Sequence, residues 1–205
     1  MHPDPRFRPD GSALLIEAER IGFAHIFAVT AQGPMVVQAP VTLHGDRLRF
    51  HVSRGNRITP HLDGASLVLS LAAAEGYVSA NFYDVPGNQV PTWNYVTIEV
   101  DGVAHAIDAA ALTEQLDRLA ALHEPRDDPW MRTKVDPAVF ATLLSGIRGF
   151  EVAITAVRGT TKLSQNKTPA DRAGVISGLR REGRQAIADR MAERQILRRP
   201  AGTQI

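Results

Sequence analysis

The densest group of ligand-binding side chains in this sequence is the stretch His51-Val52-Ser53-Arg54-Gly55-Asn56-Arg57. It follows an apolar strand pattern and places a hydroxyl, an amide and two guanidinium groups around a glycine, which lets a ligand approach the backbone. Arginine can donate two hydrogen bonds to one phosphate, and exposed backbone N–H groups add further donors. The stretch is therefore suited to hold a phosphate group, and the alternative is an ordinary basic turn.

A second group combines aromatic and amide side chains in Pro91-Thr92-Trp93-Asn94-Tyr95. Since proline cannot donate a hydrogen bond to a strand ladder, this segment is expected to enter a sheet from an edge. Alternation of side chains puts Trp93 and Tyr95 on one face and Asn94 on the other. The aromatic pair is typical of a core, while Asn94 could hydrogen-bond the edge of a planar heterocycle.

A third group is Lys162-Leu163-Ser164-Gln165-Asn166-Lys167, which holds two of the three lysines of the chain. Thr168 and Pro169 follow as the N-cap and first residue of an expected helix. By themselves these residues indicate a polar loop that leads into the helix.

The amino-acid composition excludes several kinds of cysteine and metal chemistry. Cysteine is absent from the 205 residues, which excludes disulfides, thiolate zinc sites, iron–sulfur clusters and cysteine nucleophiles. The seven histidines show no metal-binding spacing. No apolar run approaches the ~20 residues of a membrane span, and no signal-peptide pattern follows the N-terminus. We therefore expect a cytoplasmic protein with no membrane partner.

The elements that position these groups are mostly short strands. Strand patterns cover residues 22–29, 35–43, 48–52, 65–71, 77–82, 92–105 and 147–157. Helical patterns cover residues 13–20, 109–123, 137–145, 170–181 and 184–198, with Asp108 and Asp136 as N-caps of the second and third. This order predicts a mainly β fold, a small antiparallel barrel with helical additions.

Charge is distributed unevenly along the chain. Residues 1–157 hold 12 basic and 18 acidic side chains, whereas residues 158–205 hold 11 basic and 4 acidic ones. A basic end suggests an anionic partner, which could be a phosphate-bearing cofactor, nucleic acid or the acidic body of the chain itself. The arginines that could meet DNA phosphates are Arg180, Arg181, Arg184, Arg190, Arg194, Arg198 and Arg199. No helix-turn-helix pattern accompanies them, and the alternative is a solvated helix face.

The two tail helices differ in their apolar content. Ala173, Ile176 and Leu179 recur on one side of the first, which predicts that it docks on the body. The second carries Ile187 and Met191 at i, i+4 but is richer in arginine, and we expect it to be held more loosely.

Taken together, several blocks resemble the FMN-binding negative transcriptional regulators of the PaiB type. The resemblance runs along nearly the whole chain. The blocks that carry it are Arg54-Gly55-Asn56 after a strand, Pro91-Thr92-Trp93-Asn94-Tyr95, His123-Glu124 with Pro129-Trp130, Lys162-Leu163-Ser164-Gln165-Asn166, and Asp171-Arg172-Ala173-Gly174-Val175-Ile176 with Gly178-Leu179-Arg180. This resemblance implies an FMN-binding split β-barrel with C-terminal helices, the fold shared with pyridoxamine-phosphate oxidases and flavin reductases.

The resemblance also implies where FMN lies. Proteins of this fold are typically homodimers that hold FMN in a groove between the subunits. The residues implied at the ribityl phosphate are Ser53, Arg54, Asn56 and Arg57. The residues implied along the flavin ring belong to the strand at 37–41 and include Gln38, Ala39, Pro40 and Val41.

Further positions are implied outside that strand and turn. Trp93 and Asn94 would approach the flavin from the same or from the second subunit. Lys162, Gln165 and Asn166 belong to a C-terminal motif that either contacts flavin or braces the dimer. Two stretches depart from the family: Gln38-Ala39-Pro40, where a histidine is common, and Ser79-Ala80-Asn81-Phe82-Tyr83, where Ser-Pro-Ser-Trp-Tyr is usual.

The domain and function expectations follow from the same resemblance. We expect residues 1–157 to form the split barrel, with a helical insertion at about 108–145. Residues 158–205 would form the basic C-terminal motif and a helical tail that packs on the barrel or on a dimer partner. The implied function is negative transcriptional regulation. The alternative is an FMN-dependent oxidoreductase acting on an unidentified small molecule. No general acid or base is obvious beside the expected ring, and the candidates are Tyr83, His51 and Tyr95.

Overall fold

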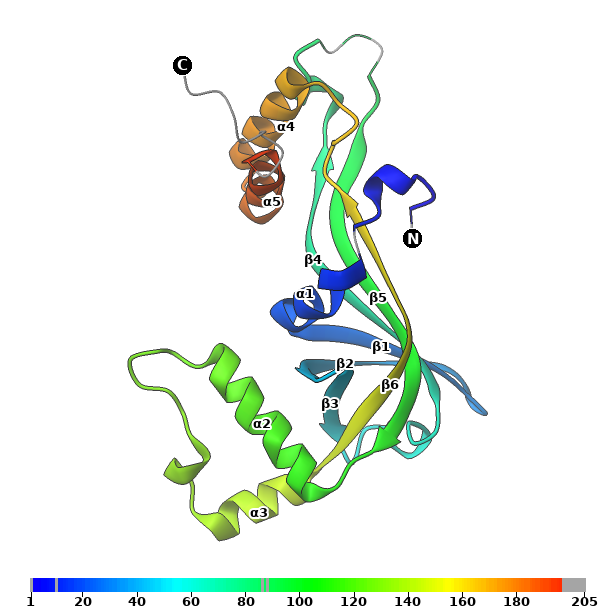
Figure 1. Cartoon of the computed structure of the whole chain (residues 1–205), viewed down its shortest axis with the longest axis vertical. Coiled ribbons are helices and arrows are strands. Elements are labelled where there is room, and N and C mark those ends of the chain that lie inside the picture. The colour runs from blue at the N-terminus through cyan, green and yellow to red at the C-terminus, as the bar shows by residue number, and fades with distance from the viewer. Residues whose placement is uncertain (1, 10, 86, 88, 197–205) are drawn as a thin grey trace. The chain divides into compact units, whose positions relative to one another are not determined.

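A computed structural model of the chain describes residues 2–9, 11–85, 87 and 89–196. Six strands close into a barrel in the order β1-β2-β3-β6-β5-β4 (Figure 1). Their bounds are β1 Phe23–Thr30, β2 Gly33–His44, β3 Arg47–Ser53, β4 Ser66–Val78, β5 Thr92–Ala106 and β6 Ile147–Lys162. The helices are α1 Leu14–Ile21, α2 Ala109–His123, α3 Pro137–Ser145, α4 Pro169–Arg181 and α5 Gln185–Ile196. The predicted antiparallel barrel with helical additions is confirmed.

Local sequence explains the first strands. Along β1 the side chains of Ala24, Ile26 and Ala28 are buried and the residues between them are exposed, which is the period of two expected of a half-buried strand. The β2–β3 hairpin closes at His44 opposite Arg47, and Gly45 adopts the positive φ of 63° that such turns favour. Pairing of β1 with β2 and β4, of β2 with β3, and of β3 with β6 is antiparallel.

The chain divides into two compact units. The barrel unit comprises Gly11–Leu71 and Ile98–Arg158, and the tail unit comprises Met1–Asp10, Ala72–Thr97 and Gly159–Ile205. Strands β4, β5 and β6 each contribute residues to both units.

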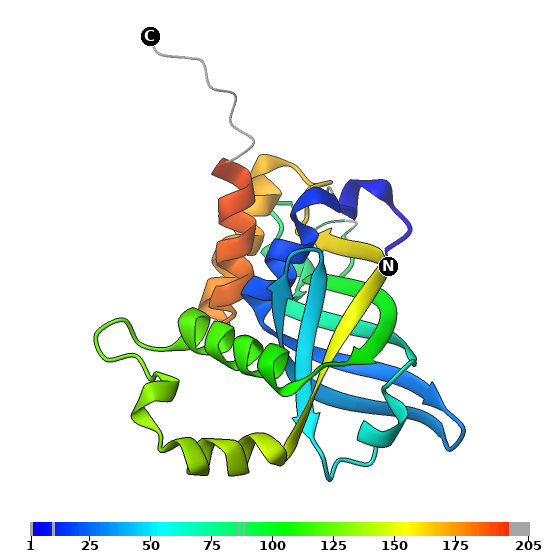
Figure 2. The same ribbon diagram turned by 60° about the horizontal axis from the view of Figure 1, so that its bottom comes forward.

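The core of the barrel unit is formed by inward-facing residues of the strands, and α1 packs against it. The Phe50 and Phe150 rings stack with their centroids 5.4 Å apart, and both are fully buried. Leu14 and Ala18 of α1 belong to the same apolar cluster. Between β5 and β6 the chain forms α2 and α3, and α2 lies against β2 and β3 (Figure 2). The side chains of Asp108 and Asp136 cap the two helices as predicted.

The tail unit has a core of its own. The α4 residues Val175 and Leu179 and the α5 residues Ile187 and Met191 pack in one cluster with Val78 of β4. The prediction that the second tail helix is loosely held is therefore wrong, because Ile187 is 1% and Met191 0% exposed. Its predicted residues 197–198 lie outside the described part of the chain.

Residues 77–82 were predicted to form a separate strand, and that prediction is also wrong. Tyr77 and Val78 are the end of β4, and Ala80–Phe82 is a turn of 3-10 helix, η4. The weak strand formers between Ala72 and Gly76 hid the continuity of β4, because pairing within the sheet outweighs local propensity.

Candidate flavin site

The predicted phosphate-binding residues form the turn that follows β3. Ser53 ends the strand, and its hydroxyl oxygen accepts a hydrogen bond from the Gly55 N–H at 3.3 Å. The Asn56 side-chain oxygen accepts from the Ile58 N–H at 3.2 Å, an Asx turn. Arg54 and Arg57 are exposed. The turn therefore presents two guanidinium groups on a backbone fixed by its own side chains.

Two further contacts anchor this turn. Thr59, which the sequence did not single out, is buried, and its hydroxyl donates to the Ser53 carbonyl at 2.7 Å. Arg54 donates from Nε to the Ser145 carbonyl at 2.7 Å, and its backbone N–H donates to the Gly146 carbonyl at 2.9 Å. The end of α3 thus holds the turn, and its contact with the Arg54 side chain uses one of the five guanidinium N–H groups.

A groove of about 450 Å³ adjoins the turn. Its walls are apolar side chains of α2, α3 and β6, including Leu112, Leu144 and Ile147, and Arg54 and Arg148 also line it. A cationic turn beside an apolar groove can accept a ligand that carries both an anionic and an apolar part.

The predicted ring-lining residues lie on β2, where β2 and β3 separate. The β2–β3 pairs run from His44–Arg47 to Val41–Phe50. Beyond that point β2 continues in its pairing with β1, and β3 continues to Ser53 opposite Ile147 of β6. The turn after β3 and the segment 38–41 therefore flank the place where the pairing of β2 with β3 ends.

The side chains of this segment alternate between the two faces of β2. Ala39 and Val41 point into the barrel core, where they belong to the apolar cluster. Gln38 is exposed and Pro40 is partly exposed. Gln38 is paired with His25 of β1, which is also exposed, so an imidazole stands next to the position where the family commonly places one in β2. The strand register brings His25 beside Gln38, and the sequence alone does not show that proximity.

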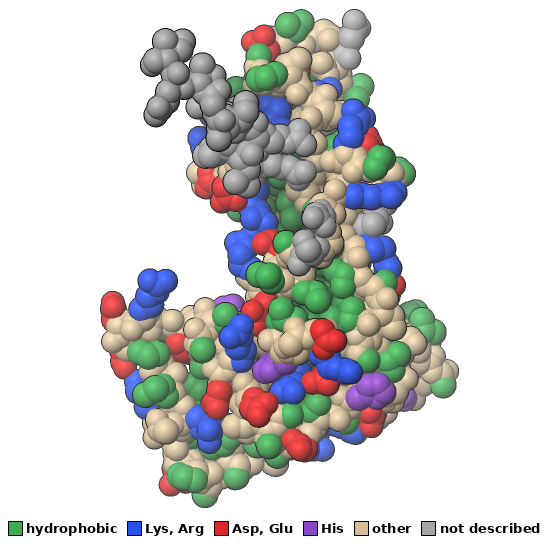
Figure 3. Space-filling view, viewed as in Figure 1, with side chains coloured by type: hydrophobic (Ala, Val, Ile, Leu, Met, Phe, Trp, Pro, Cys, Tyr) green, Lys and Arg blue, Asp and Glu red, His purple; other side chains and the backbone are tan. Residues whose placement is uncertain are grey.

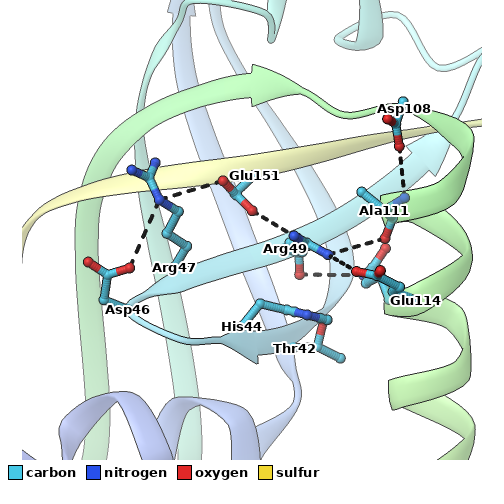
Figure 4. A network of polar contacts seen from close by, with 10 residues as sticks. Thr42, His44, Asp46, Arg47, Arg49, Asp108, Ala111, Glu114 and Glu151 are labelled. Carbon is cyan, nitrogen blue, oxygen red and sulfur yellow. Dashed lines mark hydrogen bonds and ion pairs between the residues drawn. The ribbon is translucent and has the colours of Figure 1, made fainter.

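A polar network supports β3 from the side of α2 (Figure 4). Arg49 lies between two carboxylates, with Nε 2.8 Å from Glu151 and Nη1 3.0 Å from Glu114 of α2. His51, two residues further along β3 on the same face, meets the Gln115 side chain at 3.1 Å. Burial lowers the pKa of the His51 imidazole, so its neutral form is favoured. The strand that carries the turn is thus fixed in position by α2.

Trp93 and Asn94 are in the tail unit and have different surroundings. Trp93 is 48% exposed and meets the Tyr77 ring edge-on at 6.1 Å. Asn94 is fully buried, and its Nδ2 donates to Ser164 at 2.9 Å and to the Met191 sulfur at 3.3 Å. The Asn94 amide is thereby used inside the tail unit.

The C-terminal motif also lies in the tail unit. Gln165 is bonded to backbone: its Nε2 donates to the Thr161 and Arg6 carbonyls at 2.6 and 3.0 Å, and its Oε1 accepts from the Leu163 N–H. Lys162 donates to the Thr92 hydroxyl at 2.5 Å, and burial lowers the pKa of its ammonium group. Asn166 is exposed. Gln165 braces the N-terminal segment, while Lys162 and Asn166 line a separate pocket.

The basic character of the tail is partly balanced by its own carboxylates. Arg180 pairs with Asp189 at 2.9 Å, and Arg190 approaches Glu193 at 3.5 Å. The side chain of Arg194, and Arg198 and Arg199, lie outside what the structure describes. On the barrel unit, Figure 3 shows basic and acidic side chains mixed over the visible face rather than segregated.

Among the residues that the structure describes, no three His, Cys, Asp or Glu side chains come together as metal ligands. No helix among the same residues is long and apolar enough to cross a membrane.

Comparison with known proteins gives a family and several relatives. The model of a family described as "Putative FMN-binding domain" matches residues 1–156. Protease synthase and sporulation protein PAI 2 of Bacillus subtilis is 33% identical over 107 residues, which cover 52% of this chain and 51% of that protein, so the chain matches about half of its length. An uncharacterized protein of Emericella nidulans is 28% identical over 200 residues, covering 78% of this chain and 80% of that protein.

Solved structures with a similar fold include two proteins of bacterial origin. A flavocytochrome from Azotobacter vinelandii has a TM-score of 0.64 and 17% identity, over 84% of this chain and 78% of its own. The FAD and heme binding protein of Mycobacterium smegmatis has a TM-score of 0.55 and 17% identity, over 80% of this chain and 77% of its own. These likenesses confirm the split-barrel fold.

Proposed function

This chain belongs to the FMN-binding domain family that its residues 1–156 match, and we propose that it binds FMN between β2 and the turn after β3. The arrangement of that turn is the observation that carries the proposal. A hydroxyl and two exposed guanidinium groups stand on a braced backbone, which is the donor set that a dianionic phosphate monoester requires.

The same geometry supports a position for the ring. Gln38 and Pro40 are on the outer face of β2 and could contact one face of the isoalloxazine, while Ala39 and Val41 fix the strand in the core. Asn94 is left out of this proposal, since its amide is buried and bonded. When bound, FMN would supply redox chemistry of one or two electrons. The residues of this chain would bind its phosphate and orient its ring.

We also propose that the FMN-bound form is a homodimer. Phe27 on the outer face of β1 is paired with Val36 of β2 and Val68 of β4, and these side chains are 45%, 43% and 39% exposed. Phe23 and Val29 extend the same outer face. An exposed apolar sheet face of this kind is a typical protein interface.

Light scattering should therefore give twice the chain mass of 22.3 kDa. Replacing Phe27 with Asp places a charge in the middle of the apolar face, and we expect this variant to be monomeric and to bind FMN more weakly. Val139, exposed on α3, gives a matched control: Val139→Asp should stay dimeric. A wild-type chain that remains monomeric at micromolar concentration would exclude a flavin site formed between two subunits.

The Arg54→Ala variant tests the phosphate assignment. Loss of a charge-assisted hydrogen bond removes about 1.5–3 kcal/mol of binding free energy. FMN affinity should therefore fall roughly tenfold to a hundredfold. Riboflavin, which lacks the phosphate, should bind wild type and variant alike. Fluorescence titration of both flavins measures the difference.

The control is Arg47→Ala, at the opposite end of the same strand, where both flavins should bind as in wild type. Equal loss of FMN and riboflavin affinity in Arg54→Ala would assign Arg54 to the fold, through its contact with Ser145. Unchanged FMN affinity would place the phosphate elsewhere.

The resemblance to PaiB-type proteins supports negative transcriptional regulation as the output of flavin binding. A flavin-dependent oxidoreductase is the alternative. Two assays on the same preparation of flavin-loaded protein distinguish the two functions. Salt-sensitive retention of a DNA fragment by the flavin-loaded protein would support the regulator. Anaerobic bleaching of the bound flavin by NADH or NADPH would support the enzyme.

A further inference from the structure

The tail unit contains a pocket of about 260 Å³ that the proposed flavin site does not use. Lys162 and Lys167 line it together with Asn166, and Phe7, Tyr83 and Val90 form apolar walls. Among the described residues that line this pocket, none is an aspartate or a glutamate. Two of the three lysines of the chain thus share one small cavity.

The two ammonium groups are held by neutral partners. The Lys162 Nζ is 2.5 Å from the Thr92 hydroxyl oxygen. The Lys167 Nζ is 2.7 Å from the Gln89 side-chain oxygen and 4.7 Å from the centroid of the Tyr83 ring. A hydroxyl, an amide oxygen and a ring face hold a cation in place without cancelling its charge. The pocket therefore keeps a positive potential that an anion could satisfy.

The loop between the lysines is strained. Ser164 has a φ of 54°, in the left-handed region that residues with a side chain rarely adopt. The bond from the buried Asn94 amide to the Ser164 hydroxyl holds this conformation. Backbone strain maintained by a buried side chain is found preferentially at ligand sites. The strain and the paired lysines are independent observations on one pocket.

We propose that this pocket binds a small organic anion, with its carboxylate or phosphate between Lys162 and Lys167 and its apolar part against Phe7 and Val90. Burial, and then the charge of Asp171, raise the pKa of the Tyr83 hydroxyl, which is protonated at neutral pH in any case. Tyr83 can therefore offer a ring face or a hydrogen-bond donor to the anion. This site is independent of the proposed flavin site, whose phosphate turn belongs to the barrel unit.

Isothermal titration with benzoate and phenyl phosphate, in the absence of FMN, tests the proposal. We expect binding of both anions and none of neutral benzamide. Lys162→Met should weaken binding at least tenfold. The third lysine provides the matched control, because Lys134 pairs with Asp128 on the barrel unit and Lys134→Met should have no effect. Preference for phenyl phosphate over benzoate would identify a phosphate monoester as the ligand, and the reverse a carboxylate.

Nuclear magnetic resonance of protein with ¹³C-methylated lysines gives a second readout without substitution. Benzoate should shift the signals of Lys162 and Lys167 and leave Lys134 unchanged. Equal binding of benzamide, unchanged affinity in a folded Lys162→Met variant, or no shift of either signal would overturn the proposal. Competition between benzoate and FMN would also overturn it, since the pocket would then belong to the flavin site. Failure of FMN to bind would leave these expectations unaltered.

Discussion

A chain that ends at Gly183 is expected to lose the folded tail unit. The truncation removes Ile187, Ala188 and Met191, which are 0–1% exposed and pack in the same cluster as Val175 and Leu179 of α4. Burial of one large apolar side chain is worth about 1.5–3 kcal/mol. Loss of two such side chains, and exposure of the surfaces they cover, approaches the ~5–15 kcal/mol that stabilise a typical domain. Thermal unfolding followed by circular dichroism measures the loss.

A single substitution in α5 distinguishes the effect of lost side-chain packing from the effect of a shorter chain. Met191→Ala should cost roughly 2–5 kcal/mol, because it leaves a cavity. It also removes the sulfur that accepts from the Asn94 amide. Gln185→Ala on the exposed side of the same helix should change stability by about 0.5 kcal/mol or less. A truncated chain that melts at the wild-type temperature would show that α5 contributes nothing to the tail unit.

Most elements of this fold follow from short-range patterns. The cap residues Asp108, Asp136 and Thr168 mark the starts of α2, α3 and α4, and all three side chains accept the expected backbone hydrogen bonds. The hairpin at Gly45 is likewise visible in the sequence. Such features are local, so the sequence around them contains the information needed to place them.

The errors concern long-range packing. The apolar pair Ile187 and Met191 is visible in the sequence of α5, but the arginines around it favoured a loosely held helix. The pair is buried because β4 offers a close surface at Gly76. A Cβ at Gly76 would lie 2.9 Å from the Ile187 side chain. No count of charges along one helix could predict this contact, because the residues that make it are more than one hundred positions apart in the sequence.

In the candidate sites, too, local features can be predicted from the sequence and long-range contacts cannot. The sequence shows which hydrogen-bond donors Ser53–Arg57 contains, but it does not show that Thr59 and the end of α3 anchor this turn. Asn94 and Gln165, which the resemblance places near flavin, are bonded inside the tail unit, and their contact with flavin stays a prediction. Polar residues in a motif can serve packing as well as binding, and only their partners distinguish the two roles.

The motif glycines of α4 lead to the second prediction of large effect: Gly174→Ala should destabilise the tail unit by about 3 kcal/mol. A Cβ at Gly174 would lie 2.2 Å from the Phe82 carbonyl oxygen of η4, and one at Gly178 2.4 Å from the Phe82 ring. Because the first obstacle is backbone, no side-chain rotation relieves it, and α4 or η4 must move.

Helix propensity acts in the opposite direction, which makes the sign of this result informative. Alanine is about 1 kcal/mol better than glycine inside a helix, so a freely accommodated methyl group would raise the melting temperature. We expect instead a fall of roughly 6–12 °C, which corresponds to a loss of about 3 kcal/mol in a chain of this size. Ser177→Ala, exposed on the same helix, is the matched control and should be neutral or slightly stabilising. If Gly174→Ala melted above wild type, the close approach of α4 to η4 would be refuted, and the glycine would owe its place in the motif to something other than packing.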